Sequence, residues 1–444
     1  MNDTAPDHSY LNDGLAPRKA AYKVLCDVIL KNTPLDQVLS RNEHMQSLDA
    51  RDRNLARMII MTALRHKGQM DDIIGRARNN AADLRPENIR ILLYVGLVQL
   101  LFMGVADHAA VDTTVQLTED QRLIRQKGLV NAILRRTTRE GEKWLAKQDP
   151  VQTNIPKWLL TQWVEDYGLT LAADIAKSCL SEAAIDISLK KPNEGKDWTE
   201  KLSAHLLPTG SLRLKSGGDI TQLAGFNEGT WWVQDASAAL PAKLLGPDLS
   251  GQKIVDLCAA PGGKTAQLAA AGADVIAVDR SANRLKRLDE NMTRLDLTNK
   301  VETVVADGVT WQPATPVDAV LLDAPCSATG TIRRHPDVMH LKSAEDVNRL
   351  VALQENLLNN IPNILKKGGT FIYCTCSLQK KEGEEQIQKF LDKNPDFQTV
   401  PLLTENIGGL GNAITPEGWL RLLPTNIPNQ GGMDGFFAAH LKRS

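Results

Sequence analysis

The stretch KIVDLCAAPGGKT, residues 253–265, decides the fold of the C-terminal half of this 444-residue chain. Its apolar run Lys253–Cys258 has the length of a buried strand, and the glycine turn after it leads into a helical segment. Further runs of strand length, each alternating with a helical segment, follow at Val275–Asp279, Val301–Val305, Ala319–Asp323 and Thr370–Cys376. This alternation predicts a doubly wound, Rossmann-like α/β core over residues 226–444. Ligands of such sheets bind outside the carboxyl ends of the strands.

The residues before this core follow different patterns. Residues 16–146 carry apolar side chains at helical spacing without strand-like alternation, which predicts an all-α domain. Residues 150–225 contain short strand-like runs at Ile185–Leu189 and Leu212–Leu214, which indicate a small α+β connector. Residues 1–15 are expected to form a loose tail. The chain is therefore predicted to be multidomain.

The composition limits the classes of protein to consider. Hydrophobic residues make up 42% and charged residues 24%, which excludes a mostly disordered or collagen-like chain. Lys and Arg total 52 against 53 Asp and Glu, so the net charge of −1 argues neither for nor against nucleic acid. Any contact with RNA or DNA must come from local basic patches.

The cysteines and the N-terminus predict a cytoplasmic protein. The 6 cysteines are too irregularly spaced for a disulfide framework, and the start Met1-Asn2-Asp3 lacks the features of a signal peptide. The apolar stretch Ile91–Ala106 is shorter than the roughly 20 residues that a membrane-spanning helix needs. We interpret it as a buried helix and expect no membrane partner.

The glycine turn predicts a cofactor site. A phosphate loop would need glycine where Cys258 stands, so an NTPase is disfavoured. A turn with no side chain in the way, followed by the amides of a helix, can instead receive the carboxylate of S-adenosylmethionine. The predicted contact residues in this turn are Cys258, Ala259, Ala260, Pro261, Gly262, Gly263 and Lys264.

Acidic residues end the following strand runs. Asp279 is placed to accept hydrogen bonds from the two ribose hydroxyls, and Asp307 to reach the adenine amino group. Asp323, at the end of the fourth run, completes the predicted cofactor contacts. An acidic residue at one strand end is commonly a turn residue, but acidic ends on successive strands favour a nucleotide-like cofactor.

A cysteine follows the carboxyl end of each of the last two runs. If these strands are neighbours, Cys326 and Cys376 face one crevice. Metal binding is disfavoured because additional ligands are not suitably spaced, although His335 lies near, and a redox pair would normally read C-x-x-C. We therefore interpret the two thiols as a nucleophile and its helper, and we predict no metal.

A methyl donor beside two thiols suggests methylation of a pyrimidine at C5. Thiolate addition at C6 makes C5 nucleophilic enough to attack the methyl sulfonium, and elimination after loss of the C5 proton frees the enzyme. Asp323 is predicted to assist this addition by a hydrogen bond at N3. Methylation of an amino group would not need the thiols.

The motifs DLCAAPGGKT, DAPCSATG and Thr375-Cys376-Ser377 resemble the Nol1/Nop2/Sun family of RNA cytosine-5 methyltransferases. The resemblance runs from about Trp232 to the C-terminus, and Gly432–Phe437 is similar to the family's closing strand. It implies that Cys376 is the nucleophile and that Cys326 assists product release. DNA cytosine methyltransferases attack with the Pro-Cys thiol, so Cys326 as nucleophile stays the alternative.

The helical segment resembles RNA-binding proteins of the NusB type, notably in KGLVNAILRR, residues 127–136. Together the two resemblances imply a bacterial methyltransferase of 16S ribosomal RNA, either naked or in a partly assembled small subunit. Phosphate contacts are expected at Arg333-Arg334-His335 and at Arg135-Arg136, which we place at a helix end. A non-catalytic RNA-binding assembly factor is the other hypothesis, but Cys376 and Asp279, which catalysis needs, are both present.

Overall fold

The computed structural model describes residues 14–78 and 84–444, so most of the predicted tail lies outside the described residues. The chain forms two compact units. The helical unit runs to Leu160 and includes the later segment His335–Leu341. The α/β unit comprises Thr161–Arg334 and Lys342–Ser444.

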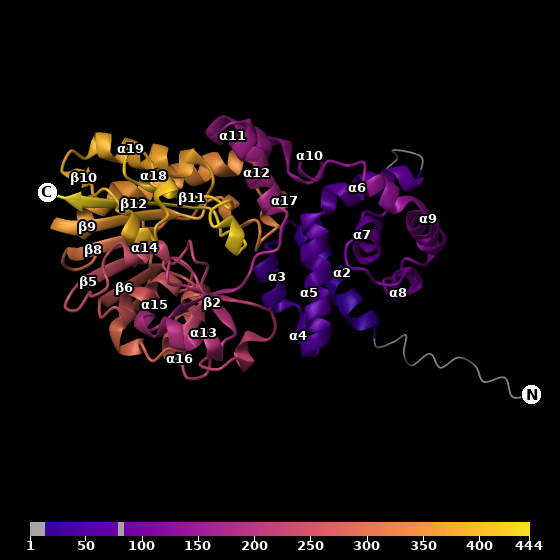
Figure 1. The fold of residues 1–444 in the computed structure, drawn as a ribbon, viewed down its shortest axis with the longest axis horizontal. Helices are drawn as coiled ribbons and strands as arrows, with labels where there is room; N and C mark the ends of the chain where they lie inside the picture. Colours follow the sequence, from indigo (N-terminus) through magenta and orange to yellow (C-terminus); the bar gives the residue numbers. More distant parts are fainter. Residues whose placement is uncertain (1–13, 79–83) are drawn as a thin grey trace, which may run out of the picture. The chain divides into compact units, whose positions relative to one another are not determined.

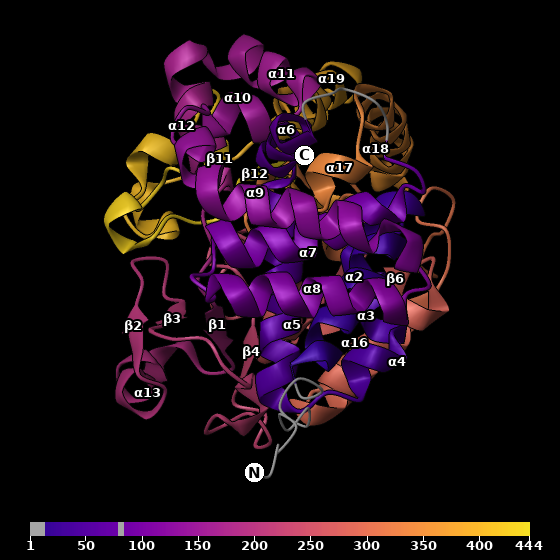
Figure 2. The ribbon, with the colours of Figure 1, turned by 90° about the vertical axis from the view of Figure 1, so that its right-hand side faces the viewer.

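The helical unit has an apolar core without strands in its described part. Its central helix is α7 (Asn88–Leu101), which is buried on nearly all sides. Figure 2 shows α8 and α9 lying side by side with it. The other helices are α2 (Leu15–Leu30), α3 (Leu35–Arg41), α4 (Glu43–Gln46), α5 (Ala50–Arg65), α6 (Lys67–Arg78), α8 (Asp107–Asp120), α9 (Lys127–Leu145), α10 (Pro150–Asn154) and α17 (Val338–Leu341). The all-α prediction is confirmed.

The predicted buried helix at Ile91–Ala106 corresponds to α7, but α7 ends earlier, at Leu101. Gly104 then takes the left-handed conformation with φ of 63°, which an α-helix does not accommodate. Nowhere in residues 14–78 and 84–444 is a helix both long and apolar enough to cross a membrane. The cytoplasmic location stays a prediction.

The α/β unit begins with the small α+β part. Helices α11 (Lys157–Tyr167), which starts before the unit boundary, and α12 (Leu169–Cys179) lead into a four-stranded antiparallel sheet of order β2-β3-β1-β4, with α13 (Gly195–Lys201) beside it. The strands are β1 (Asp186–Leu189), β2 (Ala204–Leu206), β3 (Leu212–Leu214) and β4 (Trp231–Val233). The two predicted strands are β1 and β3. Strands β2 and β4 were not predicted.

The core of the unit is an eight-stranded sheet of order β10-β12-β9-β8-β5-β6-β7, with β11 paired to β12. All five predicted runs are strands and form its parallel part, whereas β12 runs antiparallel to β9. The bounds are β5 (Lys253–Leu257), β6 (Asp274–Asp279), β7 (Val301–Val305), β8 (Val317–Asp323), β9 (Leu365–Thr375), β10 (Phe397–Thr399), β11 (Leu420–Leu422) and β12 (Phe436–Arg443).

Helices cover both faces of this sheet (Figure 1). Successive residues of a strand point to opposite faces, so Ile254 packs with one helical layer and Val255 with the other. The first layer contains α14 (Leu240–Lys243), α15 (Gly263–Ala270) and α16 (Ala282–Arg294), and the second contains α18 (Ala344–Ile364) and α19 (Glu384–Lys393). This burial on both faces explains why the strands are nearly continuous apolar runs.

Candidate active site

The strand order reverses at β5, whose neighbours β6 and β8 follow it on opposite sides of the sheet. The turn after β5 therefore lies at the crevice where doubly wound folds bind ligands. Cys258 and Gly262 in this turn have φ of 65° and 99°, and α15 starts at Gly263 without a side-chain cap. A helix N-terminus without such a cap can direct its amides at a ligand carboxylate.

Asp279 ends β6 beside this turn and is 3% exposed. Its Oδ1 accepts a hydrogen bond from the Ser281 amide at 2.9 Å. Its Oδ2 accepts from the Ala260 amide at 3.3 Å and pairs with Arg284 Nη1 at 3.1 Å. The carboxylate thus ties the end of β6 to the turn after β5 and fits a cofactor with ribose hydroxyls.

Two further aspartates lie at this end of the sheet. Asp307, two residues beyond β7, is exposed, and its Oδ1 accepts from the Val309 amide at 3.0 Å. Asp256 of β5 is fully buried, with Oδ2 bonded to Thr265 Oγ1 at 2.6 Å and with an Oδ1 that has no partner among the described residues. Burial raises the pKa of Asp256 to about 7. The unsatisfied oxygen, the uncapped helix and Asp279 together fit S-adenosylmethionine.

The two predicted catalytic thiols lie close together. Strands β8 and β9 are parallel neighbours, with Asp323 paired to Cys374, and the Sγ atoms of Cys326 and Cys376 are 3.5 Å apart. The pKa of Cys326 is raised well above its usual value, first by the hydrogen bond to Cys376, then by burial and the nearby charges of Cys376 and Glu382. Cys326 is therefore a protonated thiol at neutral pH.

Lys264 has a different partner from the one that the sequence suggested. Its backbone belongs to the cofactor turn, but its ammonium lies 2.7 Å from Asp323 Oδ2 and 4.9 Å from the ring centre of Phe436. Burial lowers the pKa of Lys264, but the Asp323 carboxylate outweighs this effect, so the pKa is raised. The charged lysine thus contacts the residue predicted to bind the base.

Cys374 is a buried strand thiol. It is fully buried in β9, and its Sγ donates a weak hydrogen bond to Asp323 Oδ1 at 3.6 Å. Burial raises its pKa well above the usual value, with a further contribution from Asp323. A thiol that remains protonated and enclosed is a poor nucleophile.

Comparisons with known proteins agree with this geometry. The family model described as 16S rRNA methyltransferase RsmB/F matches residues 242–442, and the NusB family model matches residues 15–139. The ribosomal RNA small subunit methyltransferase B of Cronobacter sakazakii is 35% identical, covering 96% of this chain and 98% of that protein. The protein of the same name from Pseudomonas putida is also 35% identical with the same coverage. The chain belongs to the 16S rRNA methyltransferase RsmB/F family.

A solved structure of a methyltransferase homologue from Pyrococcus horikoshii is also similar to the chain. It has a TM-score of 0.53 and 26% identity, and the match covers 67% of this chain and 96% of that one. As a member of the RsmB/F family, the chain is an S-adenosylmethionine-dependent rRNA methyltransferase. The predicted family, fold class, enzyme class and cofactor are confirmed.

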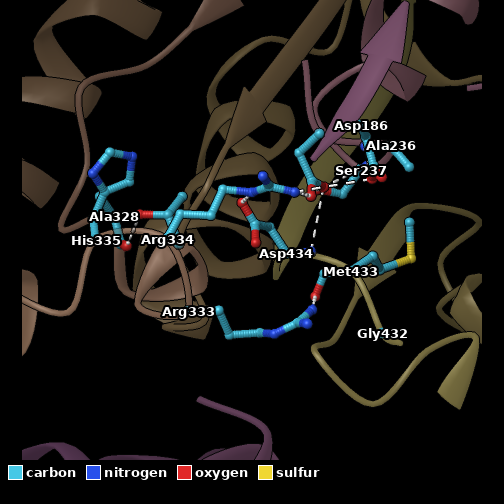
Figure 3. Close-up of polar contacts among 12 residues, drawn as sticks. Asp186, Ala236, Ser237, Ala328, Arg333, Arg334, His335, Gly432, Met433 and Asp434 are labelled. Atoms are coloured by element: carbon cyan, nitrogen blue, oxygen red, sulfur yellow. Dashed lines mark hydrogen bonds and ion pairs between the residues drawn. The ribbon is translucent and has the colours of Figure 1, made fainter. Parts of the chain in front are cut away.

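The arginines predicted to contact RNA next to the Pro-Cys loop of this RsmB/F-family chain are bound within the protein: Arg333 is buried, and the side chain of Arg334 is 19% exposed. Arg334 Nε pairs with Asp434 Oδ2 at 3.0 Å, and its Nη2 bonds Asp235 and lies 3.9 Å from Asp186 Oδ2 (Figure 3). Arg333, 3% exposed, donates to backbone carbonyls that include Met433 O at 3.2 Å. Their predicted contact with RNA phosphates is wrong, because carboxylates and carbonyls far away in the sequence already bind both guanidinium groups.

The remaining basic residues also differ from their predicted positions. His335 belongs to the helical unit, where its Nδ1 lies 3.7 Å from Asp36 Oδ2. Arg135 and Arg136 lie within α9 and not at its end. Arg135 is exposed, whereas Arg136 contacts Glu140 and donates to Ala77 O at 3.1 Å.

The sequence reasoning did not identify Glu382, which is fully buried and contacts the loops of both cysteines. The available signal was the serine that directly follows each cysteine, Ser327 and Ser377, because such paired hydroxyls at two strand ends need a common acceptor. Within the described residues no three His, Cys, Asp or Glu side chains are grouped as metal ligands.

Proposed function

We propose that this RsmB/F-family enzyme methylates C5 of a cytosine in 16S ribosomal RNA through a covalent adduct between Cys376 and C6. The observation that supports this best is the 3.5 Å separation of the Cys326 and Cys376 sulfur atoms beyond β8 and β9, next to the turn after β5. A methyl transfer to nitrogen or oxygen would need neither thiol, whereas C5 methylation has a use for both.

In the proposed first step, the Cys376 thiolate adds to C6 and leaves a carbanion-like electron pair at C5. The negative charge that this places on the base is offset by the ammonium of Lys264, which lies 2.7 Å from Asp323 Oδ2. The raised pKa keeps Lys264 charged while Asp323 contacts the Watson–Crick edge at N3. This arrangement assigns Asp323 to the Watson–Crick edge of the base and Lys264 to its charge balance.

S-adenosylmethionine supplies the methyl group when it is bound, and we propose that the 258–264 turn, Asp279 and Asp307 hold it. Asp323 stands between this set of residues and the thiols, since β8 is the neighbour of β5 on the other side. The base and the methyl donor would then meet at the reversal of strand order.

The last step is elimination, in which C5 loses its proton and the C6–S electron pair returns to Cys376. The main cause of the raised pKa of Cys326 is its hydrogen bond to Cys376. Once Cys376 is a thioether in the adduct, it no longer offers a thiolate to that hydrogen bond, so the first cause of the raised pKa of Cys326 is removed, whereas burial and the charge of Glu382 remain. We propose that Cys326 then gives its proton to solvent water and, as a thiolate, takes the proton from C5 while the C6–S electron pair returns to Cys376.

We further propose that residues 16–146 form an RNA-binding domain, followed by the 150–225 connector and the core from residue 226. Arg135, Arg139 and Lys143 are exposed and recur every four residues on α9, which places them on one side of that helix. Replacing Arg135 and Arg139 by Glu should weaken binding of 16S rRNA and lower the salt slope by about two. An unchanged slope would exclude this side of α9 as a phosphate contact.

The decisive experiment separates the two thiols on a denaturing gel with labelled 16S rRNA, protein-free or in a partly assembled small subunit. Cys326→Ser should form the adduct and stall, and therefore give a shifted band. Cys376→Ser should give neither a band nor 5-methylcytosine, because serine supplies almost no anion at neutral pH. Cys179→Ala, a buried thiol of α12, serves as the control. The reverse pattern would show that the Pro-Cys thiol attacks.

A further inference from the structure

The buried carboxylate of Glu382 bridges the two loops that carry the thiols. Its Oε1 accepts from the Ser327 amide at 2.9 Å, and its Oε2 accepts from Ser377 Oγ at 2.6 Å and from Ser327 Oγ. Ser327 directly follows Cys326, and Ser377 directly follows Cys376. We propose that Glu382 is a positioning residue that sets the distance between the two thiols.

The Pro-Cys loop is held on both sides of Cys326. Gln354 of α18 donates one hydrogen bond from Nε2 to Pro325 O at 2.9 Å and another to Glu382 Oε1 at 3.0 Å. Cys326 therefore lies between a carbonyl bound by Gln354 and an amide bound by Glu382. Gln354 contacts both the Pro-Cys loop and the Glu382 carboxylate. A displacement of the carboxylate therefore also disturbs the loop.

The Thr-Cys loop is fixed to the same group. Besides the Ser377 hydroxyl bond to Glu382, Arg421 Nη1 donates to Ser377 O at 2.6 Å. The backbone of Glu382 is itself anchored, since Tyr373 of β9 donates its hydroxyl to Glu382 O at 2.8 Å. The carboxylate is thus a fixed acceptor, and the two loops are positioned relative to it.

The chemistry of the contacts explains why a carboxylate stands here. It only accepts hydrogen bonds, and the groups around it include two hydroxyls, an amide N–H and the Gln354 amide group. A buried carboxylate is costly unless its oxygens are satisfied, and here both are. Glutamine at this position keeps one acceptor oxygen and replaces the other by an NH₂ group, so the four groups that donate to Glu382 cannot all keep their hydrogen bonds in the present direction.

This inference rests on the proposed function, in which one thiol must act on the adduct that the other has formed. A misplacement of about 1 Å in such a pair can reduce the rate roughly 100-fold. We therefore expect Glu382→Ala to lower kcat about 100-fold and Glu382→Gln about tenfold, with the affinity for S-adenosylmethionine unchanged. Glu385→Gln, an exposed glutamate of α19, should behave as wild type.

A chemical cross-link measures the thiol spacing without reference to methylation. Diamide oxidises two neighbouring thiols to a disulfide, while its N=N bond takes up the two electrons and two protons. The full-length wild type should form the Cys326–Cys376 disulfide rapidly, as judged by mass spectrometry of its peptides. Glu382→Ala, Glu382→Gln and the Ser327→Ala/Ser377→Ala double variant should form it at least tenfold more slowly, while labelling of the partly exposed Cys26 is unchanged.

Wild-type rates of cross-linking and methylation in folded Glu382→Gln and in the double serine variant would overturn the proposal. The absence of a Cys326–Cys376 disulfide in the wild type would also overturn it, because the thiols would then not be neighbours. If the wild type makes no 5-methylcytosine but the Glu382 variants still slow the cross-link, the proposed function fails and the positioning role stands. Glu382→Ala alone does not decide the question if it unfolds, so the glutamine and serine variants carry the test.

Discussion

The cofactor assignment is tested most directly by replacing Asp279 with asparagine. Asparagine has almost the same shape, and its remaining oxygen can still accept from the Ser281 amide, which contacts Oδ1 at 2.9 Å. The second oxygen becomes an NH₂ group that faces the Ala260 amide and Arg284. The charge and one acceptor are lost without leaving a cavity.

Two effects are expected and can be measured separately. Loss of the hydrogen bond from the Ala260 amide should lower the free energy of unfolding by about 0.5–1.5 kcal/mol. Loss of a charged acceptor for the ribose hydroxyls should cost about 1.5–3 kcal/mol of binding free energy. At about 1.4 kcal/mol per factor of ten, S-adenosylmethionine should bind about 10- to 150-fold more weakly.

Isothermal titration calorimetry with S-adenosylmethionine measures the affinity, and urea unfolding measures the stability. Asp289→Asn is the matched control, because Asp289 is an exposed aspartate on the neighbouring helix α16. The Asp289→Asn variant should bind S-adenosylmethionine with the same affinity as the wild type. If Asp279→Asn is folded and binds S-adenosylmethionine within twofold of the wild type, Asp279 does not hold the ribose and the cofactor must lie elsewhere.

Three other substitutions test the packing around the site. Arg334→Ala leaves two buried aspartates without their cation, so urea unfolding should show a loss of about 3–5 kcal/mol, and an unchanged midpoint would contradict the ion pairs. Gly330→Ala places a Cβ 2.0 Å from the carbonyl oxygen of Gly435, so it should lower stability by about 1–3 kcal/mol and reduce methylation, whereas wild-type values would refute this close approach. Burial raises the pKa of Asp256 to about 7, whereas an aspartate in an unfolded chain has a pKa of about 3.9. The folded state therefore binds the Asp256 proton more tightly than the unfolded state does. The stability that this proton contributes is lost as the pH rises from about 4 through 7. Asp256→Asn should make unfolding less dependent on pH over that range, and an equal slope in the variant would show that Asp256 does not titrate there.

Much of the catalytic fold was predictable because its signals are local. Each buried strand of the parallel sheet is a short apolar run, and the turn after β5 carries its own glycines. The position of the candidate site could be predicted from these strands, because parallel strands all end on the same side of the sheet. Strands of three residues are at the limit of this reasoning, because so few residues show no periodicity: β3 was predicted, whereas β2 and β4 were not.

Side-chain partners were less predictable, because they come from distant parts of the sequence. Arg333 and Arg334 were expected to face RNA, since a run of basic residues next to a loop looks like exposed charge. Their partners, among them Asp235 and Asp434, lie about 100 residues away on either side. A sequence shows a charge, but it does not show the opposite charge that folding brings to it.

The sequence alone determined the alternation of strands and helices, the glycine turn and the two thiols that follow successive strands. These features depend on neighbours within a few residues and on the rule that consecutive parallel strands lie close together. Only the tertiary structure decided that Lys264 contacts Asp323, that Glu382 joins both cysteine loops, and that both arginines after the Pro-Cys loop have partners within the protein. The direction of a long polar side chain depends on which donors and acceptors the packed chain leaves within about 3 Å of it, and that set exists only after folding.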